Sequence, residues 1–496
     1  MHDALNLCRR PALWGMLLSL SVLPTLASCG GAESGNGGGA ETKVDPLAQR
    51  EHHRERPPVV VIGVDGMTWN VVEPLFQAGK MPHMRKLVDD GLAGNLMTDR
   101  PPYSPVLWTS IATGVKFPEH GIHYFTEAAV SGKPKPGGLP YTSNSRKVPA
   151  IWNLAGEHGR TVNSVAWWVS WPAERVPNAR IVASYAAQAQ ATILWKPLVM
   201  KDGLPGLTYP PELQETISDN LYAGRPNGPL VEEYNDQFGV VPEDWTFAHK
   251  LDRFFRGVFH ADRTHERIFL QMLEEHGVAD LNLVYYGLPD VAGHYFWRYR
   301  APQNYSYGMP PEHIERLGAH IDLAYEQFDA WLGNMVEALP EDAIIMLVSD
   351  HGMGPENIDN AANIQSGGHT NAPPGVFVLS GPGVQPVGLQ PRGKRTIGGI
   401  YDITPTILDL LGLPSGSYMV GNPLRTMMTE EWRNAHPEIE PKDYRVGYRP
   451  ATAPLIPTED ANNVFLEAIH QLGYVESSEE MFEGTAGDPE PTPDGK

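Results

Sequence analysis

Two hydrophobic patterns alternate along this chain and predict its secondary structure. The run Val59–Val64 is continuously apolar and rich in β-branched residues, which is typical of a buried parallel strand. Similar runs predict strands at 161–167, 281–286, 343–348 and 376–379. Apolar residues at helical spacing predict helices at 70–78, 82–90, 250–275 and 314–339. This alternation predicts an α/β fold with a doubly wound, mostly parallel sheet.

The pattern changes in two regions. Residues 126–256 are rich in Gly, Pro, Asn and aromatic residues and lack a long periodic segment, which predicts a loop-rich cap inserted into a main domain of residues 57–428. Residues 429–496 form a C-terminal extension with one predicted helix at 460–472. Its last residues, from about Glu479, are acidic and rich in Gly and Pro, which predicts disorder.

The N-terminus has the pattern of an export signal. Arg9 and Arg10 precede an apolar run that ends in Leu26-Ala27-Ser28-Cys29. The run is too short for a comfortable membrane span, so we interpret residues 1–28 as a signal peptide. The last four residues resemble the lipobox of bacterial lipoproteins, which predicts lipidation at Cys29, a flexible tether at 29–56 and anchoring to the cell envelope. The alternative is a plain secretory signal with a coincidental Cys.

Composition narrows the possible chemistry. The chain has 38 Lys and Arg against 59 Asp and Glu, a formal net charge of −21, which disfavours an extended nucleic acid as partner. A small anionic substrate is still possible, because bound metal ions reverse the local field. Its two cysteines, Cys8 and Cys29, both lie in the N-terminal segment. Any metal site must therefore use histidines and carboxylates.

Candidate functional residues follow the predicted strands or start the predicted helices, where open parallel sheets place their sites. Asp65-Gly66 directly follows the first strand. Ser104 stands at a predicted helix N-cap, with Pro105 at the first helical position and Gly114 at the exit. A serine there faces the positive end of the helix dipole, a favourable place for phosphate. Taken alone, each is better explained as an ordinary turn or cap.

The other candidates are histidines and carboxylates. Asp290 and His294 are four residues apart after the strand 281–286, and Asp350-His351 follows the strand 343–348. His369 lies in a short Gly-rich loop. Asp350 and His351 can cooperate only if the strand ends there, since adjacent strand residues point to opposite faces. Three carboxylates, three histidines and a serine would suit two ions such as zinc or manganese better than calcium or magnesium.

Together these motifs resemble the alkaline phosphatase superfamily, and within it the type I phosphodiesterase/nucleotide pyrophosphatase family. The resemblance runs from about Val59 to Leu413, with its anchors at 104–122, 289–294, 349–353 and 400–413. It implies an alkaline-phosphatase-like fold and a two-metal hydrolase that acts on a small phosphate ester through a phosphoseryl intermediate. The same resemblance implies these roles: Asp65, Asp350, His351 and the nucleophile Ser104 at one metal, and Asp290, His294 and His369 at the other.

One position departs from the family pattern. Eukaryotic members place an Asn soon after His-Gly-Ile, whereas Phe125 stands at that place here and cannot donate a hydrogen bond. His123 is the alternative donor. We interpret His120 in the same motif as structural, and Trp167, Trp168 and Trp171 as core residues.

Several functions therefore remain open. A phosphodiesterase is favoured over a phosphomonoesterase, because aromatic residues outnumber cations near the motifs. A sulfatase is disfavoured, since Ser104 lacks the Cys/Ser-x-Pro-x-Arg context, and so is a mutase, which would meet little phosphosugar outside the cell. A surface lipoprotein that keeps the fold without catalysis is the alternative from a different class.

Overall fold

The computed structural model describes residues 56–126, 141–184, 206–225 and 227–448. The described residues all belong to one compact unit, Glu51–Lys496. The predicted signal peptide, Cys29, the helix at 460–472 and the acidic tail lie outside the described residues, and so does the tether apart from Arg56. None of the helices within the described ranges is long and apolar enough to span a membrane.

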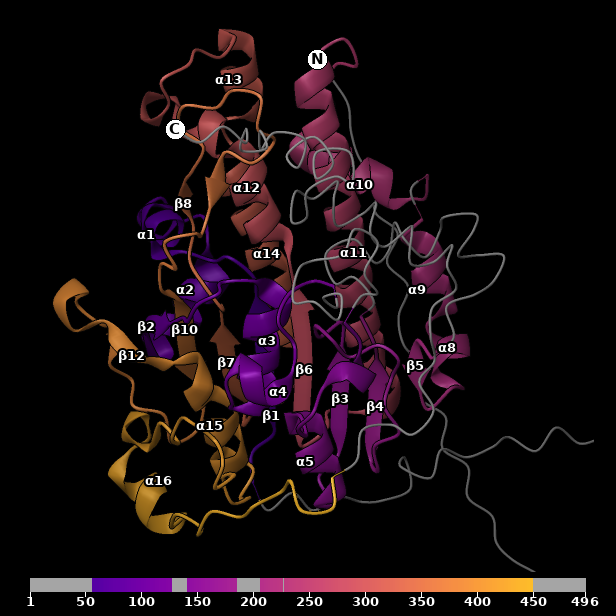
Figure 1. Cartoon of the computed structure of the whole chain (residues 1–496), viewed down its shortest axis with the longest axis vertical. Coiled ribbons are helices and arrows are strands. Elements are labelled where there is room, and N and C mark those ends of the chain that lie inside the picture. Colours follow the sequence, from indigo (N-terminus) through magenta and orange to yellow (C-terminus); the bar gives the residue numbers. More distant parts are fainter. Residues whose placement is uncertain (1–55, 127–140, 185–205, 226, 449–496) are drawn as a thin grey trace, which may run out of the picture. The chain divides into compact units, whose positions relative to one another are not determined.

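A ten-stranded sheet forms the centre of the described part, in the order β11-β2-β10-β7-β1-β6-β3-β4-β5, with β12 also paired to β2 (Figure 1). Strands β4, β3, β6, β1 and β7 run parallel, whereas β10 is antiparallel to both β7 and β2. This confirms the predicted α/β class with a mostly parallel sheet. The strand bounds are β1 Val59–Val64, β2 Leu92–Met97, β3 Val162–Val165, β4 Ala179–Val182, β5 Thr208–Tyr209, β6 Leu281–Tyr286, β7 Ile344–Val348, β10 Gly375–Ser380, β11 Gly388–Leu389 and β12 Thr396–Gly399, with a separate pair, β8 Gly354–Pro355 and β9 Gly367–Gly368.

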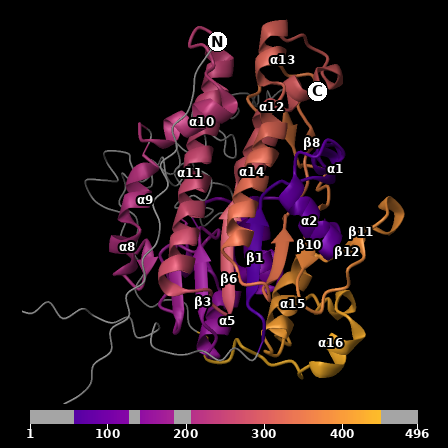
Figure 2. The same ribbon diagram turned by 180° about the vertical axis from the view of Figure 1, so that it is seen from behind.

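Helices cover both faces of the sheet. Figure 1 shows α3, α4, α5 and α15 in front of it, and Figure 2 shows α2, α11 and α14 on the opposite face. The helix bounds are α1 Trp69–Gln77, α2 Pro82–Asp90, α3 Ser104–Thr113, α4 Phe117–His120, α5 Ile151–Glu157, α8 Leu213–Thr216, α9 Ser218–Ala223, α10 Leu230–Phe238, α11 Thr246–His276, α12 Leu288–Arg300, α13 Pro311–Leu317, α14 His320–Glu337, α15 Ile403–Leu410 and α16 Glu430–Ala435. Because both faces are covered, every residue of β1, β6 and β7 is buried, which explains their uninterrupted apolar sequences.

The structure adds one strand that was not predicted and corrects two predicted elements. The sequence 92–97 reads Leu-Ala-Gly-Asn-Leu-Met and gave no strand signal, yet it forms β2 because β10 and β12 pair with it on either side. Residues 126–256 are not only a cap, since β3, β4 and β5 extend the central sheet and α5 covers it. The predicted helix 314–339 is two helices, α13 and α14, separated at Gly318 and Ala319.

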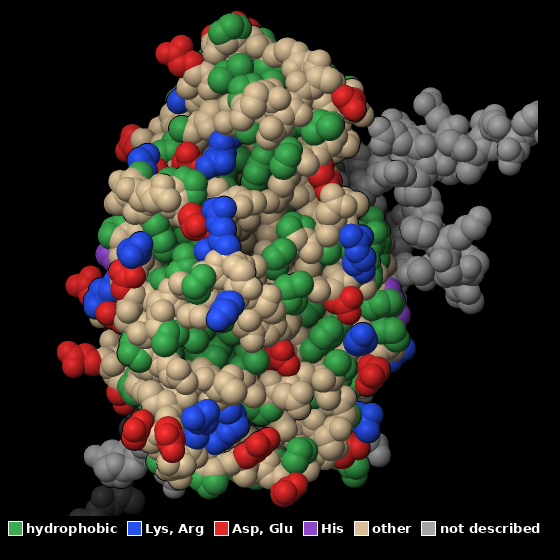
Figure 3. All heavy atoms as spheres, turned by 90° about the vertical axis from the view of Figure 1, so that its left-hand side faces the viewer, with side chains coloured by type: hydrophobic (Ala, Val, Ile, Leu, Met, Phe, Trp, Pro, Cys, Tyr) green, Lys and Arg blue, Asp and Glu red, His purple; other side chains and the backbone are tan. Residues whose placement is uncertain are grey.

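Surface charge is mixed on the face drawn in Figure 3. Acidic and basic side chains are interspersed there among apolar and uncharged groups, without a continuous region of one sign. This face therefore has no large basic surface of the kind that nucleic acid polymers require.

The arrangement of three central strands positions the candidate site. Strand β1 lies between β6 and β7, with Val64 paired to Tyr286 and Gly63 to Val348. The residues that follow these strands therefore emerge at the same edge of the sheet. Asp65, the start of α12 and the Ser349–His351 turn meet there, as the sequence predicted.

Candidate functional site

Asp65 is held in one orientation by two aromatic side chains. Its side chain is fully buried, and its Oδ2 accepts hydrogen bonds from Tyr285 Oη at 2.6 Å and from Trp108 Nε1 at 3.0 Å. Its Oδ1 lies 3.3 Å from His351 Nε2. Oδ2 is thus fixed by the two hydrogen bonds, while Oδ1 faces His351.

Asp290 and His294 lie on α12, one turn apart on the same face. The carboxylate of Asp262 on α11 accepts hydrogen bonds from the backbone N–H groups of Gly287 (2.8 Å) and Leu288 (2.7 Å), which caps this helix start. His294 Nδ1 lies 2.9 Å from the Gly367 carbonyl oxygen, so this nitrogen carries the proton. Its Nε2 faces the site and lies 3.5 Å from Asp290 Oδ1.

Asp350 and His351 follow β7 in a turn, as the sequence required. Ser349 Oγ accepts a hydrogen bond from Met67 N–H at 2.9 Å and donates one to the His351 carbonyl at 2.8 Å, which fixes the turn against the loop after β1. Gly352 packs so closely that an added Cβ would lie 2.6 Å from the Pro374 carbonyl oxygen. His351 Nδ1 lies 3.1 Å from the Gly352 carbonyl, and its Nε2 lies 3.5 Å from Asp350 Oδ2.

His369 joins the two histidines from the loop after β9. Its ring stacks on that of His351 with centroids 3.8 Å apart, and the His294 centroid is 5.1 Å away. The segment that carries His369 can approach α12 closely because residue 367 is a glycine. A Cβ added there would lie 2.3 Å from the Gly293 carbonyl oxygen. This close packing lets a partly exposed histidine reach the buried ones.

Two groups of these side chains have metal-binding geometry. Ligand atoms of Asp290, His294 and His369 lie within 4.8 Å of one another, and so do those of Asp65, Asp290 and His351. The structure therefore brings together the six residues predicted from the sequence. It differs in one respect, since Asp290 belongs to both groups and Asp350 lies beside the second through His351.

The electrostatics of the site favour bound cations. Burial, together with the negative charges of Asp65 and Asp290, raises the pKa of Asp350 well above its usual range. Burial lowers the pKa of His294, and burial with the neighbouring His351 and His294 lowers that of His369. A divalent ion binds neutral imidazoles and offsets the repulsion between neighbouring carboxylates. His369 Nδ1 has no hydrogen-bond partner among the described residues, so it can serve as a ligand atom. The donor set therefore fits ions that accept mixed nitrogen and oxygen ligands.

Ser104 is the first residue of α3 rather than its N-cap. Tyr103 is the N-cap residue, because its extended backbone presents the carbonyl that accepts the first helical bonds, from Val106 and Leu107. Ser104 is 1% exposed, and its Oγ has no hydrogen-bond partner within the described ranges. The helix ends at Gly114, whose φ of 71° is left-handed, as predicted. A buried hydroxyl without a partner is costly in a purely structural role.

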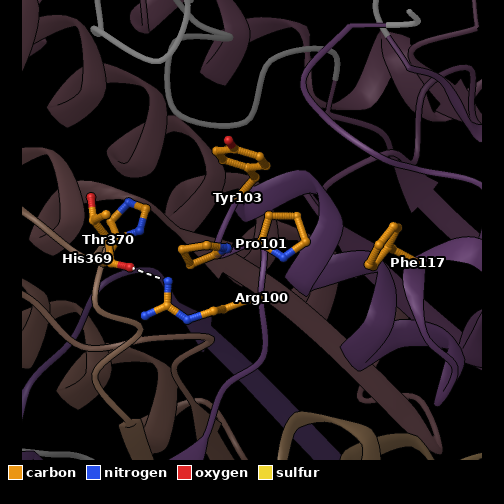
Figure 4. A pocket seen from close by; sticks show the side chains of 7 residues that line it. Arg100, Pro101, Tyr103, Phe117, His369 and Thr370 are labelled. Atoms are coloured by element: carbon orange, nitrogen blue, oxygen red, sulfur yellow. Dashed lines mark hydrogen bonds between the residues drawn. The ribbon is translucent and has the colours of Figure 1, made fainter. Parts of the chain in front are cut away.

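A hollow of about 510 Å³ lies between the residues just before α3 and the loop that carries His369. Tyr103, Arg100, Pro101, Phe117 and His369 are among the residues that line it. Figure 4 shows the aromatic rings and the guanidinium around this space, with Arg100 bonded to the Thr370 carbonyl. A group bound here would lie next to both His369 and the residue that precedes Ser104.

The structure places the remaining sequence candidates outside the ligand groups. His120 is buried and lies 3.0 Å from Ser110 Oγ, while its Nδ1 accepts a hydrogen bond from Ile122 N–H. It thus links α4 to α3, and burial lowers its pKa to about 3. Phe125 is buried and contacts the rings of Tyr103 and Trp168. His123 is exposed to solvent and its ring packs edge-on against Phe117. Trp167, Trp168 and Trp171 are core residues, as expected.

Three supporting residues were missed from the sequence: Trp108, Tyr285 and Asp262. Trp108 was assigned only to a helix and Tyr285 only to a buried strand. Asp262 lies within a long amphipathic helix, where a charged residue usually faces solvent. A signal existed for Tyr285, since its hydroxyl would need a partner inside a fully buried strand.

Changing Tyr285 to Phe should weaken the site without disturbing the fold. The change removes the hydrogen bond to Asp65 Oδ2 and keeps the ring that packs edge-on against Trp108. Loss of such a supporting bond typically lowers metal affinity or activity about 10- to 100-fold. The measurement is zinc affinity by competition with a chelator.

Tyr286→Phe is the matched control for this change. Tyr286 is the next residue, equally buried, and its hydroxyl contacts Met335 Sδ instead of the site. Equal zinc affinity in both variants would contradict the role assigned to Tyr285.

The fold and the site together define an α/β protein with a buried carboxylate–histidine centre of the kind that holds divalent metal ions. The sequence model of the family described as "Type I phosphodiesterase / nucleotide pyrophosphatase" matches residues 59–393. The chain belongs to this family, as the sequence motifs indicated.

The individual proteins that the chain resembles match it over part of its length or at low sequence identity. The 2,3-bisphosphoglycerate-independent phosphoglycerate mutase of Chloroflexus aggregans is 30% identical over 151 residues, which is 29% of this chain and 23% of the mutase. The chain thus matches about a quarter of the length of that curated relative. Among solved structures, murine ectonucleotide pyrophosphatase / phosphodiesterase 5 is similar at 11% identity and a TM-score of 0.44, covering 75% of this chain and 100% of that one. Phosphonoacetate hydrolase from Sinorhizobium meliloti is similar at 18% identity and a TM-score of 0.34, with coverages of 60% and 57%.

Proposed function

We propose that this protein hydrolyses phosphoric esters, diesters in preference to monoesters, with Ser104 as nucleophile and two divalent metal ions as cofactors. One observation carries the proposal: a hollow is lined both by His369, a member of one of two overlapping acidic and histidine groups, and by Tyr103, which precedes Ser104. The buried Ser104 hydroxyl has no hydrogen-bond partner among the described residues. Membership of the phosphodiesterase family agrees with it.

The proposed assignment of ligands follows the two groups. Asp290, His294 and His369 would hold one ion, and Asp65, His351 and Asp350 the other, with Asp290 between them. Zinc suits this mixed set, and manganese is the alternative. Such ions, when bound, neutralise the phosphoryl oxygens and lower the pKa of a nearby hydroxyl.

The chain's own residues would carry the bond changes. Ser104 Oγ loses its proton and attacks phosphorus, so an Oγ–P bond forms while the bond to the leaving alcohol oxygen breaks and that oxygen takes up a proton. The product is a phosphoseryl intermediate, which still carries the second ester group when the substrate is a diester. Water then adds to phosphorus and releases Ser104. The start of α3 favours the negative charge that develops there.

The preference for diesters is inferred from the lining of the hollow. Its walls are mostly rings, from Tyr103, Phe117 and two prolines, with a single cation, Arg100. A monoester has two charged terminal oxygens that need several cations, whereas a diester needs apolar surface for its second organic group.

Hydrolysis of two chromogenic esters tests the function. We expect the metal-loaded protein to hydrolyse bis(p-nitrophenyl) phosphate with a kcat/KM at least about 10-fold above that for p-nitrophenyl phosphate, because the second ring gains apolar contact. A chelator should abolish turnover, and zinc or manganese should restore it. The reverse ratio would favour a phosphomonoesterase. Absence of turnover with either ester and either metal would favour a non-catalytic binding protein.

A further inference from the structure

Arg100 is a cation at the mouth of the hollow that the reaction proposed above does not use. It is exposed, and its Nη1 donates a hydrogen bond to the Thr370 carbonyl oxygen at 2.8 Å. Thr370 follows His369, so the guanidinium lies beside the loop that carries a candidate metal ligand. Figure 4 shows Arg100 beneath Pro101 with Tyr103 on the other side of the space. A guanidinium has five N–H groups, and this contact uses one of them.

The nearby carboxylates have other partners. Asp99, the preceding residue, accepts a hydrogen bond from Tyr401 Oη at 2.7 Å and lies 3.8 Å from Lys116 Nζ. Glu356 accepts hydrogen bonds from the backbone N–H and the hydroxyl of Thr370. Among the described residues, Arg100 forms no ion pair. An unpaired guanidinium beside a binding hollow, in a chain with a net charge of −21, is a local anion site.

The walls around this charge are apolar. Tyr103 packs edge-on against Tyr124, with ring centroids 4.7 Å apart, and also contacts Phe125. Pro101 and Pro102 also line the hollow, and Figure 4 shows Phe117 across from Pro101. The hollow therefore offers flat apolar surfaces for a ring with one positive charge at its edge. That combination suits an organic group that is aromatic and anionic at once.

We infer that Arg100 is a specificity-determining residue, which selects phosphate diesters whose second organic group carries its own anionic function, such as a carboxylate. This inference rests on the proposed function, because it places the second ester group of the substrate in the hollow beside His369. Arg100 binds the carboxylate through its outward N–H groups while the ring of the substrate lies against Tyr103 and the prolines. Phosphorus chemistry remains with Ser104 and the ligand groups.

A purely structural role for Arg100 gives different expectations. If its bond to Thr370 served only to hold the His369 loop, its loss would impair metal binding and would lower activity toward every substrate alike. Recognition of the substrate's charge instead lowers activity only toward anionic substrates. The two roles therefore separate when charged and neutral substrates of equal size are compared.

The test uses Arg100→Gln with p-nitrophenyl phenyl phosphate and p-nitrophenyl 4-carboxyphenyl phosphate. We expect the unaltered full chain to prefer the carboxylated ester, and the variant to lose about 10-fold in kcat/KM on that ester alone, as the loss of one exposed charged hydrogen bond predicts. Activity on the neutral ester should stay within about twofold of the unaltered protein, because that ester carries no anionic group for the guanidinium to bind. An equal fall on both esters would overturn the inference.

Lys116→Gln is the matched control. It removes the same charge from the neighbouring segment, where Lys116 faces Asp99 instead of the hollow. A selective loss of equal size in this variant would assign the preference to the overall electrostatic field of the protein and overturn the role of Arg100.

A binding experiment separates this inference from the proposed function. Calorimetry on the zinc-loaded chain compares the affinity for phenyl phosphate with that for 4-carboxyphenyl phosphate. If no ester is hydrolysed, the proposed function fails. Tighter binding of the carboxylated ligand that Arg100→Gln abolishes would still support the inference about Arg100. Equal binding of the two ligands would overturn that inference.

Discussion

Replacing Ser104 with Ala is expected to lower kcat/KM for bis(p-nitrophenyl) phosphate at least about 10³-fold, because removal of the attacking atom leaves only positioning and electrostatic effects. The buried Oγ has no hydrogen-bond partner among the described residues, so its removal leaves no group unpaired and should not destabilise the fold. Steady-state kinetics and the metal content of the variant are the measurements. A second readout is a Ser104 phosphopeptide after acid quenching during turnover, which the variant should lack.

Ser110→Ala is the control for this change. Ser110 lies in the same helix and is equally buried, but its Oγ contacts His120 instead of the hollow. We expect a fall of less than about 10-fold, because the change removes contacts of α3 with His120 and Tyr401 and no candidate metal ligand. If the Ser104 variant kept most of its activity at full metal content, Ser104 would not be the nucleophile. Direct attack by water would then be the better mechanism.

Replacing Asp290 with Asn should remove both metal ions. Asp290 is the one residue shared by the two groups found among the described residues, and its carboxylate lies within 4.8 Å of ligand atoms in each. Asn keeps the shape of the side chain but not its charge, so the fold should be retained while the affinity for both ions falls. We expect the metal content to fall from about two ions per chain to near none, with activity at least about 10³-fold lower.

His369→Ala distinguishes this result from a general loss of metal. His369 belongs to only one group and comes from a partly exposed loop, so its removal should release one ion and leave Asp65 and His351 with theirs. Elemental analysis after gel filtration in limiting zinc is the measurement. Retention of two ions by the Asp290 variant would contradict the bridging position. Equal loss in both variants would show that the two groups do not bind independently.

Much of the fold was predictable because its strongest signals are local. Strands β1, β6 and β7 are buried on both faces, so their sequences had to be apolar throughout, and helix α2 has the predicted bounds 82–90. Strand β2 was missed because Gly94 and Asn95 interrupt its apolar pattern, and it is a strand only through its partners β10 and β12. The start of α3 was predicted one residue late, because the backbone of Tyr103 decides where the helical bonds begin.

The sequence by itself indicated the candidate residues, because Asp65, Asp290, Asp350 and His351 follow apolar strands and their motifs resemble those of the type I phosphodiesterase/nucleotide pyrophosphatase family. Only the tertiary structure decided how these residues divide between the two ligand groups. The position of Asp290 between two groups depends on the packing of α12 against the β1 turn and the β9 loop. The supporting bonds from Tyr285 and Trp108 to Asp65 span 220 and 43 residues. Contacts between residues so far apart leave no local pattern, since they are fixed by strand register and helix packing rather than by neighbours in the chain.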